Sequence, residues 1–109
     1  MISKRGGMVT YIADMVEEEG KRLNEVIAVI IEETAKMPKG SIVWKTIDKK
    51  VYPYLQWREG DKIKARFVKR EELSELQEVI QQRREYEKRV KELKGYVREI
   101  EKMLGRLIK

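Results

Sequence analysis

Residues 71–109 read EELSELQEVIQQRREYEKRVKELKGYVREIEKMLGRLIK, and this stretch decides the fold. Its apolar side chains recur at alternating steps of three and four residues, the a/d heptad pattern of a helix that packs on another helix. They form two columns: Leu76, Arg83, Val90, Val97 and Leu104; and Val79, Tyr86, Leu93, Ile100 and Leu107. Arg83 alone breaks the apolar rule. The pattern predicts a continuous helix of roughly 55 Å, which needs a partner helix to cover its stripe.

The sequence offers that partner upstream. Residues 8–37 keep heptad spacing and predict an N-terminal helix. Glu19 interrupts the stripe, and Gly20 allows a break there, because glycine inside a helix costs about 1 kcal/mol relative to alanine. Residues 26–31 are apolar nearly all round, so we expect them to be the most buried part of the protein. Residues 1–7 predict a flexible arm.

Two further expectations follow from the seam. Arg83 is predicted either to pair with Glu19 or Glu33 of the first helix, or to lie where the seam opens to water. The second helix has 39 residues against 30 in the first, so its tail would be exposed in a single chain. The exposed residues would be Ile100, Leu104 and Leu107. We therefore expect a homodimer or a higher homo-oligomer that forms through the helices.

Between the helices, residues 38–70 predict a three-stranded antiparallel β-meander. Pro38 and Gly40 end the first helix. Stretches rich in β-branched and aromatic residues follow at 42–47, 51–58 and 62–68, and Gly60 supplies the positive φ of a tight second hairpin. The predicted fold class is α+β and mostly α, a long helical hairpin or coiled coil with the meander inserted. We expect one domain overall.

Alternation at period two assigns the side chains of the meander to two faces. With a two-residue second turn, one face carries Tyr52, Tyr54, Gln56, Ile63, Ala65 and Phe67, and the other carries Leu55, Trp57, Lys62, Lys64 and Arg66. The first turn stays open. A two-residue turn puts Trp44 on the basic face and Lys45 with the tyrosines, and a three-residue turn does the reverse. Pro53 predicts an irregularity or a pairing gap in the central strand.

The net charge of +6 is concentrated in the middle of the chain. Residues 1–38 carry −2, residues 39–70 carry +7 and residues 71–109 carry +1. A concentrated positive patch attracts polyanions more strongly than the same charge spread over a surface. The alternative is that the lysines keep a small exposed sheet soluble and block pairing at its edges.

Several classes of function are excluded or disfavoured. The chain has no cysteine and no histidine, which removes thiol chemistry, disulfides, imidazole bases and the usual zinc and haem ligands. It shows no glycine-rich phosphate loop and no nucleophile–base pair, so we expect no enzyme activity, metal or cofactor. No segment is apolar for long enough to cross a bilayer, and no signal peptide is recognisable, so we expect a cytoplasmic location. The abundance of Lys, Arg and Glu is typical of a thermophilic source.

The sequence of the middle of the chain also resembles that of known proteins. Its pattern is Gly40-Ser41-Ile42, then Tyr52-x-Tyr54-Leu55-Gln56-x-Arg58-x-Gly60-x-Lys62, then Phe67-Val68, then a Glu- and Arg-rich helix. It resembles a group of short prokaryotic proteins with a domain of unknown function, seen in thermophilic and anaerobic bacteria and in archaea. The meander is also similar to the small DNA-binding β element of some transposases and tyrosine-type integrases. This likeness covers residues 39 to 84 and implies binding alone, because the chain lacks a recombinase catalytic region. Pro53 departs from the usual aromatic run.

The candidate binding residues are basic and aromatic side chains of the meander: Lys45, Lys49, Lys50, Trp57, Arg58, Lys62, Lys64 and Arg66. Such cations contact phosphates or base edges, and Trp57 and Tyr52 can stack on unpaired bases. The alternative is that the aromatic residues pack the sheet onto the helices. The sequence thus predicts a small non-enzymatic protein that binds DNA or RNA. A protein–protein interaction module and a toxin–antitoxin or phage component are the other candidates.

Overall fold

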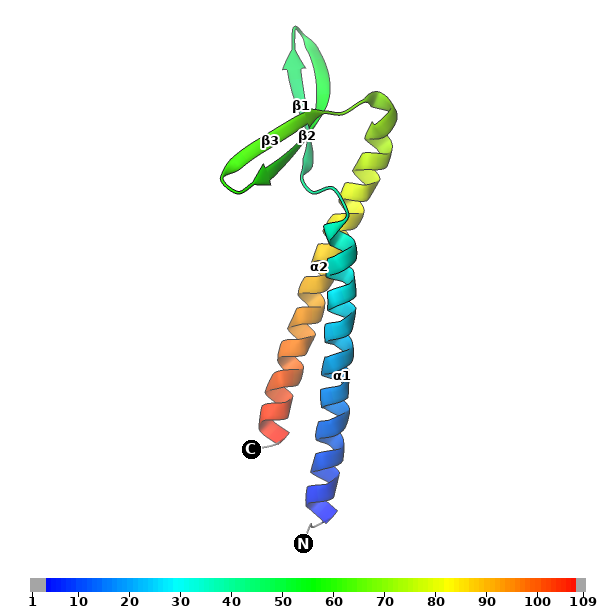
Figure 1. Cartoon of the computed structure of the whole chain (residues 1–109). Coiled ribbons are helices and arrows are strands. Elements are labelled where there is room, and N and C mark those ends of the chain that lie inside the picture. The colour runs from blue at the N-terminus through cyan, green and yellow to red at the C-terminus, as the bar shows by residue number, and fades with distance from the viewer. Residues whose placement is uncertain (1–3, 108–109) are drawn as a thin grey trace. The chain divides into compact units, whose positions relative to one another are not determined.

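The computed structural model describes residues 4–107 and contains two long helices with a three-stranded sheet between them in the sequence (Figure 1). The elements are α1 (Lys4–Ala35), β1 (Ser41–Ile47), β2 (Lys50–Glu59), β3 (Lys62–Phe67) and α2 (Arg70–Leu107). The predicted fold class is confirmed. The chain divides into two compact units, and one domain overall stays a prediction. Of the described residues, 4–33 and 87–107 form the helical unit and 34–86 form the sheet unit.

In the helical unit α1 and α2 run antiparallel, side by side (Figure 1). The buried core consists of Leu23, Ile27 and Leu93, with 8%, 6% and 3% of their surface exposed. Half-buried side chains pack around it: Val26, Ile30, Val90, Val97 and Ile100. These residues belong to the two predicted heptad stripes, so the spacing of apolar residues sets the packing of this unit. Between residues 4 and 107, neither helix has a stretch apolar and long enough to cross a lipid bilayer.

α1 is unbroken and begins earlier than the sequence predicts. It continues through Gly20, where a Cβ atom would lie 3.3 Å from Cγ2 of Ile100, so the glycine serves a close approach of the two helices instead of a break. The helix starts at Lys4, so the prediction of a flexible arm is wrong for residues 4–7. Residues 1–3 lie outside the described part of the chain.

The expected exposure of the α2 tail is also wrong. Ile100 packs against the core of the helical unit, and Leu104 and Leu107 are half-buried. The reason is that α2 is shared between the units, because residues 70–86 belong to the sheet unit and only residues 87–107 run along α1. The overhang lies on the other helix, since the first turns of α1 extend beyond the described end of α2 (Figure 1).

The apolar run at residues 26–31 is less buried than expected. Val29 and Ile31 keep 60% and 47% of their surface exposed. A helix that is apolar nearly all round needs neighbours on several sides, and α1 has one covering helix here, so part of the run stays in solvent.

Both turns of the sheet contain two residues. Strands pair antiparallel in the order β1-β2-β3, and the first turn is short because Ile47 pairs directly with Lys50. Its central residues, Asp48 and Lys49, have φ of 51° and 69°, as a type I′ turn requires. In the second turn Gly60 has a φ of 59°. The register that the sequence left open is therefore that of a two-residue first turn.

Pro53 marks the place where β3 ends. It lies within β2 opposite Trp44 of β1, and its carbonyl accepts a hydrogen bond from the N–H of Val68 at 3.1 Å. In an antiparallel ladder the N–H and C=O of one residue face the same neighbouring strand, so the N–H that Pro53 lacks would also face Val68. The predicted pairing gap lies on this side. β1 consequently pairs with residues 50–56 and β3 with residues 54–59 of the long central strand.

One face of the sheet packs on the start of α2. A buried cluster joins Leu55, Val68, Leu76 and Ile80, with Ile42, Trp57 and Leu73 around it. We call this side the core face. Residues that pair across strands share a side, so the core face also carries Trp44, Lys62, Lys64 and Arg66. The opposite side, which we call the open face, carries Val43, Lys45, Lys50, Tyr52, Tyr54, Gln56, Arg58, Ile63, Ala65 and Phe67.

Arg83 joins the end of α1 to α2 within the sheet unit. Its guanidinium donates hydrogen bonds to the carbonyl of Thr34, at 3.0 Å, and to the carbonyl of Met37. The last carbonyls of a helix have no donor within the helix, so Arg83 supplies one from a neighbouring element. Glu19, which the sequence proposed as a partner of Arg83, forms its ion pair with Arg22 on its own helix.

Candidate functional site

The open face presents a line of alternating residues along β2. Lys50, Tyr52, Tyr54, Gln56 and Arg58 follow one another at period two, so their side chains leave the same side of the strand. At about 3.3 Å per residue the line is roughly 26 Å long. It therefore has a cation at each end, two phenol rings near its centre and an amide between the rings and Arg58.

The rings of this line form a small cluster with a third aromatic residue. Phe67 of β3 meets Tyr52 and Tyr54 edge to face, with ring centres 6.2 Å and 5.9 Å apart. From β1, the ammonium group of Lys45 lies over the ring of Tyr54, 4.7 Å from its centre. The cluster draws on all three strands, so the pairing of the whole sheet sets its geometry.

The cluster stays in contact with solvent. Phe67 is 50% exposed and the neighbouring Ile63 is 61% exposed, whereas Tyr52 and Tyr54 are half-buried. The buried cluster of the sheet unit draws its sheet residues from the core face, and the open face supplies none of them. Aromatic rings on an uncovered sheet beside cations are suited to non-covalent binding of a flat, negatively charged ligand.

The structure separates the predicted binding residues into two groups. Lys45, Lys50 and Arg58 lie on the open face, and Lys49 occupies the first turn. The remaining four lie on the core face: Trp57, Lys62, Lys64 and Arg66. The eight residues therefore do not form one surface.

Two cations of the core face are held by carboxylates. Lys64 pairs with Glu59 at 2.9 Å, and Arg66 pairs with Glu72 at 3.0 Å. The bond from Lys64 lowers the pKa of Glu59, helped by the indole N–H of Trp57. These pairings reduce the positive potential that the core face offers to a ligand.

The position of Glu72 also explains its pKa. Its carboxylate accepts the backbone N–H of Lys69, at 3.0 Å, and this bond, together with the pairing with Arg66, lowers the pKa of Glu72. Lys69 directly precedes α2, so the bond caps the helix by the reciprocal arrangement that a glutamate in the first turn provides. The carboxylate thus has a structural task at the junction of β3 and α2.

Trp57 is placed for packing. It lies against the buried cluster, and its indole Nε1 donates to the Glu59 carboxylate at 3.1 Å. The stacking role that the sequence suggested for Trp57 therefore has less support than that of Tyr52.

A hollow of about 510 Å³ opens beside Trp57 on the core side of the sheet unit. Its lining includes Met37, Leu55, Arg66 and Arg83. Both arginines have bonds to the protein, Arg66 to Glu72 and Arg83 to the main chain at and just after the end of α1. This hollow is consequently a weaker site for an anion than the open face.

The described residues include no cluster of side chains that could hold a metal ion. No group of three or more acidic, histidine or cysteine side chains between residues 7 and 107 comes close enough to hold a metal ion. The side chains gathered on the open face are amines, guanidinium, phenols and apolar groups. They can attract, stack and donate hydrogen bonds.

Sequence reasoning assigned Tyr54 and Phe67 to the correct face but did not select them as binding residues. The alternative was that the aromatic residues pack the sheet onto the helices, because rings usually supply much of a core. The signal that identifies the core face is aliphatic. Ile42, Leu55 and Val68 occur at positions that share one side across the three strands, and they match Leu76 and Ile80 of the first turns of α2.

Comparison with known protein families gives a match over the middle of the chain. A family model described as "Domain of unknown function (DUF6788)" matches residues 14–78, which include most of α1, the whole sheet and the start of α2. Neither the curated proteins nor the solved structures gave a match. Because the matched region is more than half of the chain, the protein belongs to the family of the domain of unknown function DUF6788.

Proposed function

We propose that this protein binds single-stranded nucleic acid on the open face of its sheet. The observation that carries the proposal is the line Lys50, Tyr52, Tyr54, Gln56 and Arg58, joined by the ring of Phe67 and the ammonium of Lys45. Exposed rings stack on bases irrespective of sequence, and cations beside them contact the phosphates. We propose a cytoplasmic location on the same ground, since nucleic acid is available there.

A single strand suits this surface better than a duplex. The bases of a duplex are stacked on one another, so their faces are not available to Tyr52, Tyr54 or Phe67. In a single strand of nucleic acid the bases are unpaired, so they can stack on the aromatic rings once the nucleic acid lies along the sheet. The cations at the two ends of the β2 line and Lys45 beside it would then follow the backbone.

The charge of the sheet region supports the same proposal. Residues 39–70 carry +7, and Lys49 and Lys50 lie at the tip of the first hairpin, beyond the aromatic cluster. Such a concentration of charge raises the encounter rate with a polyanion. Binding of this kind weakens steeply as salt is added, because each neutralised phosphate releases a counterion.

Fluorescence anisotropy with labelled single-stranded DNA, single-stranded RNA and duplex DNA tests the proposal. We expect both single strands to bind more tightly than the duplex, with affinity falling as the salt concentration rises. Absence of binding at low salt would overturn the proposal. Preference for the duplex would show that the rings do not take part.

A second candidate function is a protein–protein interaction module, and exposed apolar side chains on α1 favour it. Met8, Tyr11 and Met15 are 62%, 63% and 57% exposed. A soluble helix usually covers such a row with a partner. Purification of one stoichiometric protein partner with the chain, in the absence of nucleic acid, would support this function over the first.

A further inference from the structure

α1 carries a second heptad column that α2 does not cover. Met8, Met15, Arg22 and Val29 recur every seven residues, and the three apolar members are 62%, 57% and 60% exposed. The column that faces α2 is a different one, with the buried residues Ala13, Gly20 and Ile27. A seven-residue repeat of apolar side chains is the pattern of a helix that packs on another helix. α1 therefore has the sequence of a helix with two neighbours.

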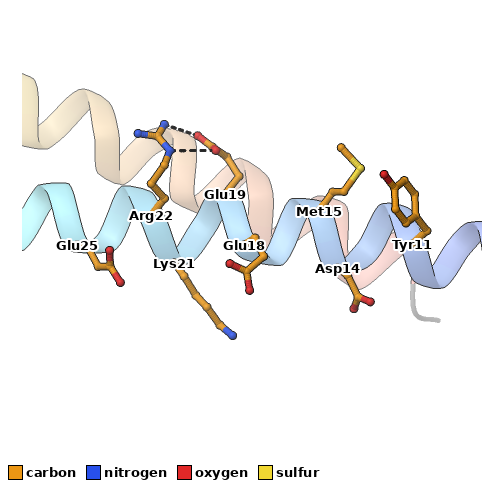
Figure 2. A pocket seen from close by; sticks show the side chains of 8 residues that line it. All are labelled: Tyr11, Asp14, Met15, Glu18, Glu19, Lys21, Arg22 and Glu25. Atoms are coloured by element: carbon orange, nitrogen blue, oxygen red, sulfur yellow. Dashed lines mark hydrogen bonds and ion pairs between the residues drawn. The ribbon is translucent and has the colours of Figure 1, made fainter.

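Figure 2 shows the middle of this column and the charges beside it. A shallow hollow on α1 is lined by Tyr11 and Met15 and by the ion pair between Arg22 and Glu19. Three carboxylates and the ammonium group of Lys21 line it as well, the carboxylates being those of Asp14, Glu18 and Glu25. The surface is thus an apolar row with an acidic border.

α2 carries a matching column in the helical unit. Arg89, Tyr96 and Met103 recur every seven residues, and Tyr96 and Met103 are 53% and 45% exposed. Gly20 of α1 lies next to Ile100 of α2, so these two residues are at the same height along the antiparallel helix pair. On α1, Met15 and Val29 each come one residue before Val16 and Ile30, which face α2, and on α2 Tyr96 and Met103 each come one residue before Val97 and Leu104. One residue is a turn of about 100° around the helix axis. Because the two helices are antiparallel, these equal turns put both columns on the same broad side of the helix pair. The pair consequently has one extended apolar face formed by both helices.

The net charges of the two helices indicate which partner fits this apolar face. Residues 4–33 of α1 contain seven acidic and four basic residues, a net charge of −3. Residues 87–107 of α2 contain four acidic and seven basic residues, a net charge of +3. A second copy of the chain therefore brings to the apolar face one acidic and one basic helix, which are complementary to the two helices already there.

Two twofold arrangements can join such faces. In one, α1 packs on α1 of the partner, and two helices with a net negative charge meet. In the other, α1 packs on α2 of the partner, and opposite charges meet along both contacts. Like charges in apposition disfavour the first arrangement, so complementarity selects the second.

We propose that the helical unit forms a twofold-symmetric dimer, a four-helix bundle in which α1 of each copy packs antiparallel on α2 of the other. The interface covers the column of Met8, Met15 and Val29 on α1 and that of Tyr96 and Met103 on α2. The twofold axis runs along the bundle, so the overhanging first turns of the two α1 helices lie at the same end and cover one another. This proposal does not rest on binding of nucleic acid.

Sedimentation equilibrium of the full chain, with two neighbouring substitutions, tests whether this face is used. Val29→Arg places a charge in the interface, and Ala28→Arg places the same charge on an exposed position about 100° away on α1. We expect the unsubstituted chain and Ala28→Arg to be dimers, and Val29→Arg to dissociate at least about tenfold more readily. A monomer at every accessible concentration, or equal effects of the two substitutions, would overturn the proposal.

Cross-linking tests which helices meet, because the chain has no native cysteine. A Met15→Cys chain is mixed with a Met103→Cys chain, and the two masses are distinguished by a tag on one of them. We expect the oxidised mixture to contain the disulfide-linked heterodimer. Efficient linkage of an Arg22→Cys chain to itself, with none in the mixture, would show that α1 packs on α1 and would overturn the proposed arrangement.

Discussion

The ammonium group of Lys45 on β1 lies over the ring of Tyr54 on β2, 4.7 Å from the ring centre. This contact exists because the first turn has two residues, which pairs Lys45 with Tyr52 and places it on the open face. A shift of one residue would move Lys45 to the opposite side of the sheet. The turn at Asp48 and Lys49 therefore determines which cation accompanies the aromatic cluster.

Replacing that turn by Asp48→Asn with Lys49→Gly should stabilise the protein. Both native residues have positive φ, which costs free energy for the lysine in particular, whereas Asn-Gly is a preferred pair of a type I′ turn. We expect the free energy of unfolding to rise by about 1 kcal/mol, measured by urea denaturation followed by circular dichroism. A lower free energy of unfolding would contradict the assigned turn.

Gly40→Ala should be one of the most damaging small substitutions in the sheet unit. Gly40 has a φ of 115°, and a Cβ atom there would lie 2.2 Å from the carbonyl oxygen of Gln56 on β2. Gly60 has a positive φ of 59° but open space around the same position, so Gly60→Ala is the matched control. We expect losses of at least about 2 kcal/mol for Gly40→Ala and about 1 kcal/mol for Gly60→Ala. Equal losses in urea denaturation would show that the close contact has no part in the effect.

Acid should weaken the junction of β3 and α2 through Glu72. The backbone N–H of Lys69 and the guanidinium of Arg66 hold the pKa of Glu72 below its ordinary value of 4.5. A carboxyl group whose pKa is lower in the folded than in the unfolded state stabilises the fold above the unfolded pKa, and this stabilisation is lost as the pH falls through the folded pKa.

We therefore expect the stability of the native chain to decline as the pH falls below about 4.5, and Glu72→Gln to decline less steeply. Urea denaturation between about pH 3 and pH 7 measures both curves. Glu78→Gln, at another exposed carboxyl group on α2, is the control for charge. A Glu72→Gln curve parallel to that of the native chain would contradict the assigned bonds of the carboxylate.

The aromatic side chains of the open face should strengthen binding of a single strand by stacking on its bases. Tyr52→Leu and Tyr54→Leu keep an apolar residue in the strand but remove the ring, and each should weaken binding of a single strand by about fivefold or more. Trp44→Leu is the control, since Trp44 is an exposed aromatic residue on the core face. An effect of Trp44→Leu as large as that of the tyrosine variants would show that the rings of the open face are not the stacking surface.

Most of the fold follows from local signals in the sequence. The heptad spacing of Leu93, Val97 and Ile100 predicts their place in the helical core, and the alternation within residues 62–68 predicts the two sides of β3 correctly. The length of the first turn did not follow, because neither Asp48 nor Lys49 is a residue that favours positive φ as strongly as glycine does. The structure shows a two-residue turn nonetheless.

The sequence was less informative about which part of α2 packs on the sheet and which part packs on α1. The heptads of α2 continue past Tyr86, where the sheet unit ends, and only Arg83 departs from them nearby. That change explains why Ile100 is covered and why the overhang lies on α1. The structure places the candidate binding residues on two faces of the sheet. Alternation shows which residues of a strand share a side, but not which side packs on α2. The side of Lys45 depends on the length of the first turn, so the sequence left open that Lys45 and Lys64 lie on opposite faces.

The most direct test of the proposed function compares the two faces at equal charge. One variant carries Lys45→Gln, Lys50→Gln and Arg58→Gln on the open face. The other carries Lys62→Gln, Lys64→Gln and Arg66→Gln on the core face. Each loses three positive charges, and the affinity for a labelled single strand is measured by anisotropy over a range of salt concentrations.

We expect the open-face variant to bind much more weakly, with the slope of log affinity against log salt reduced by about 2, and the core-face variant to stay close to the native chain. Equal losses in the two variants, or a larger loss in the core-face variant, would contradict the account.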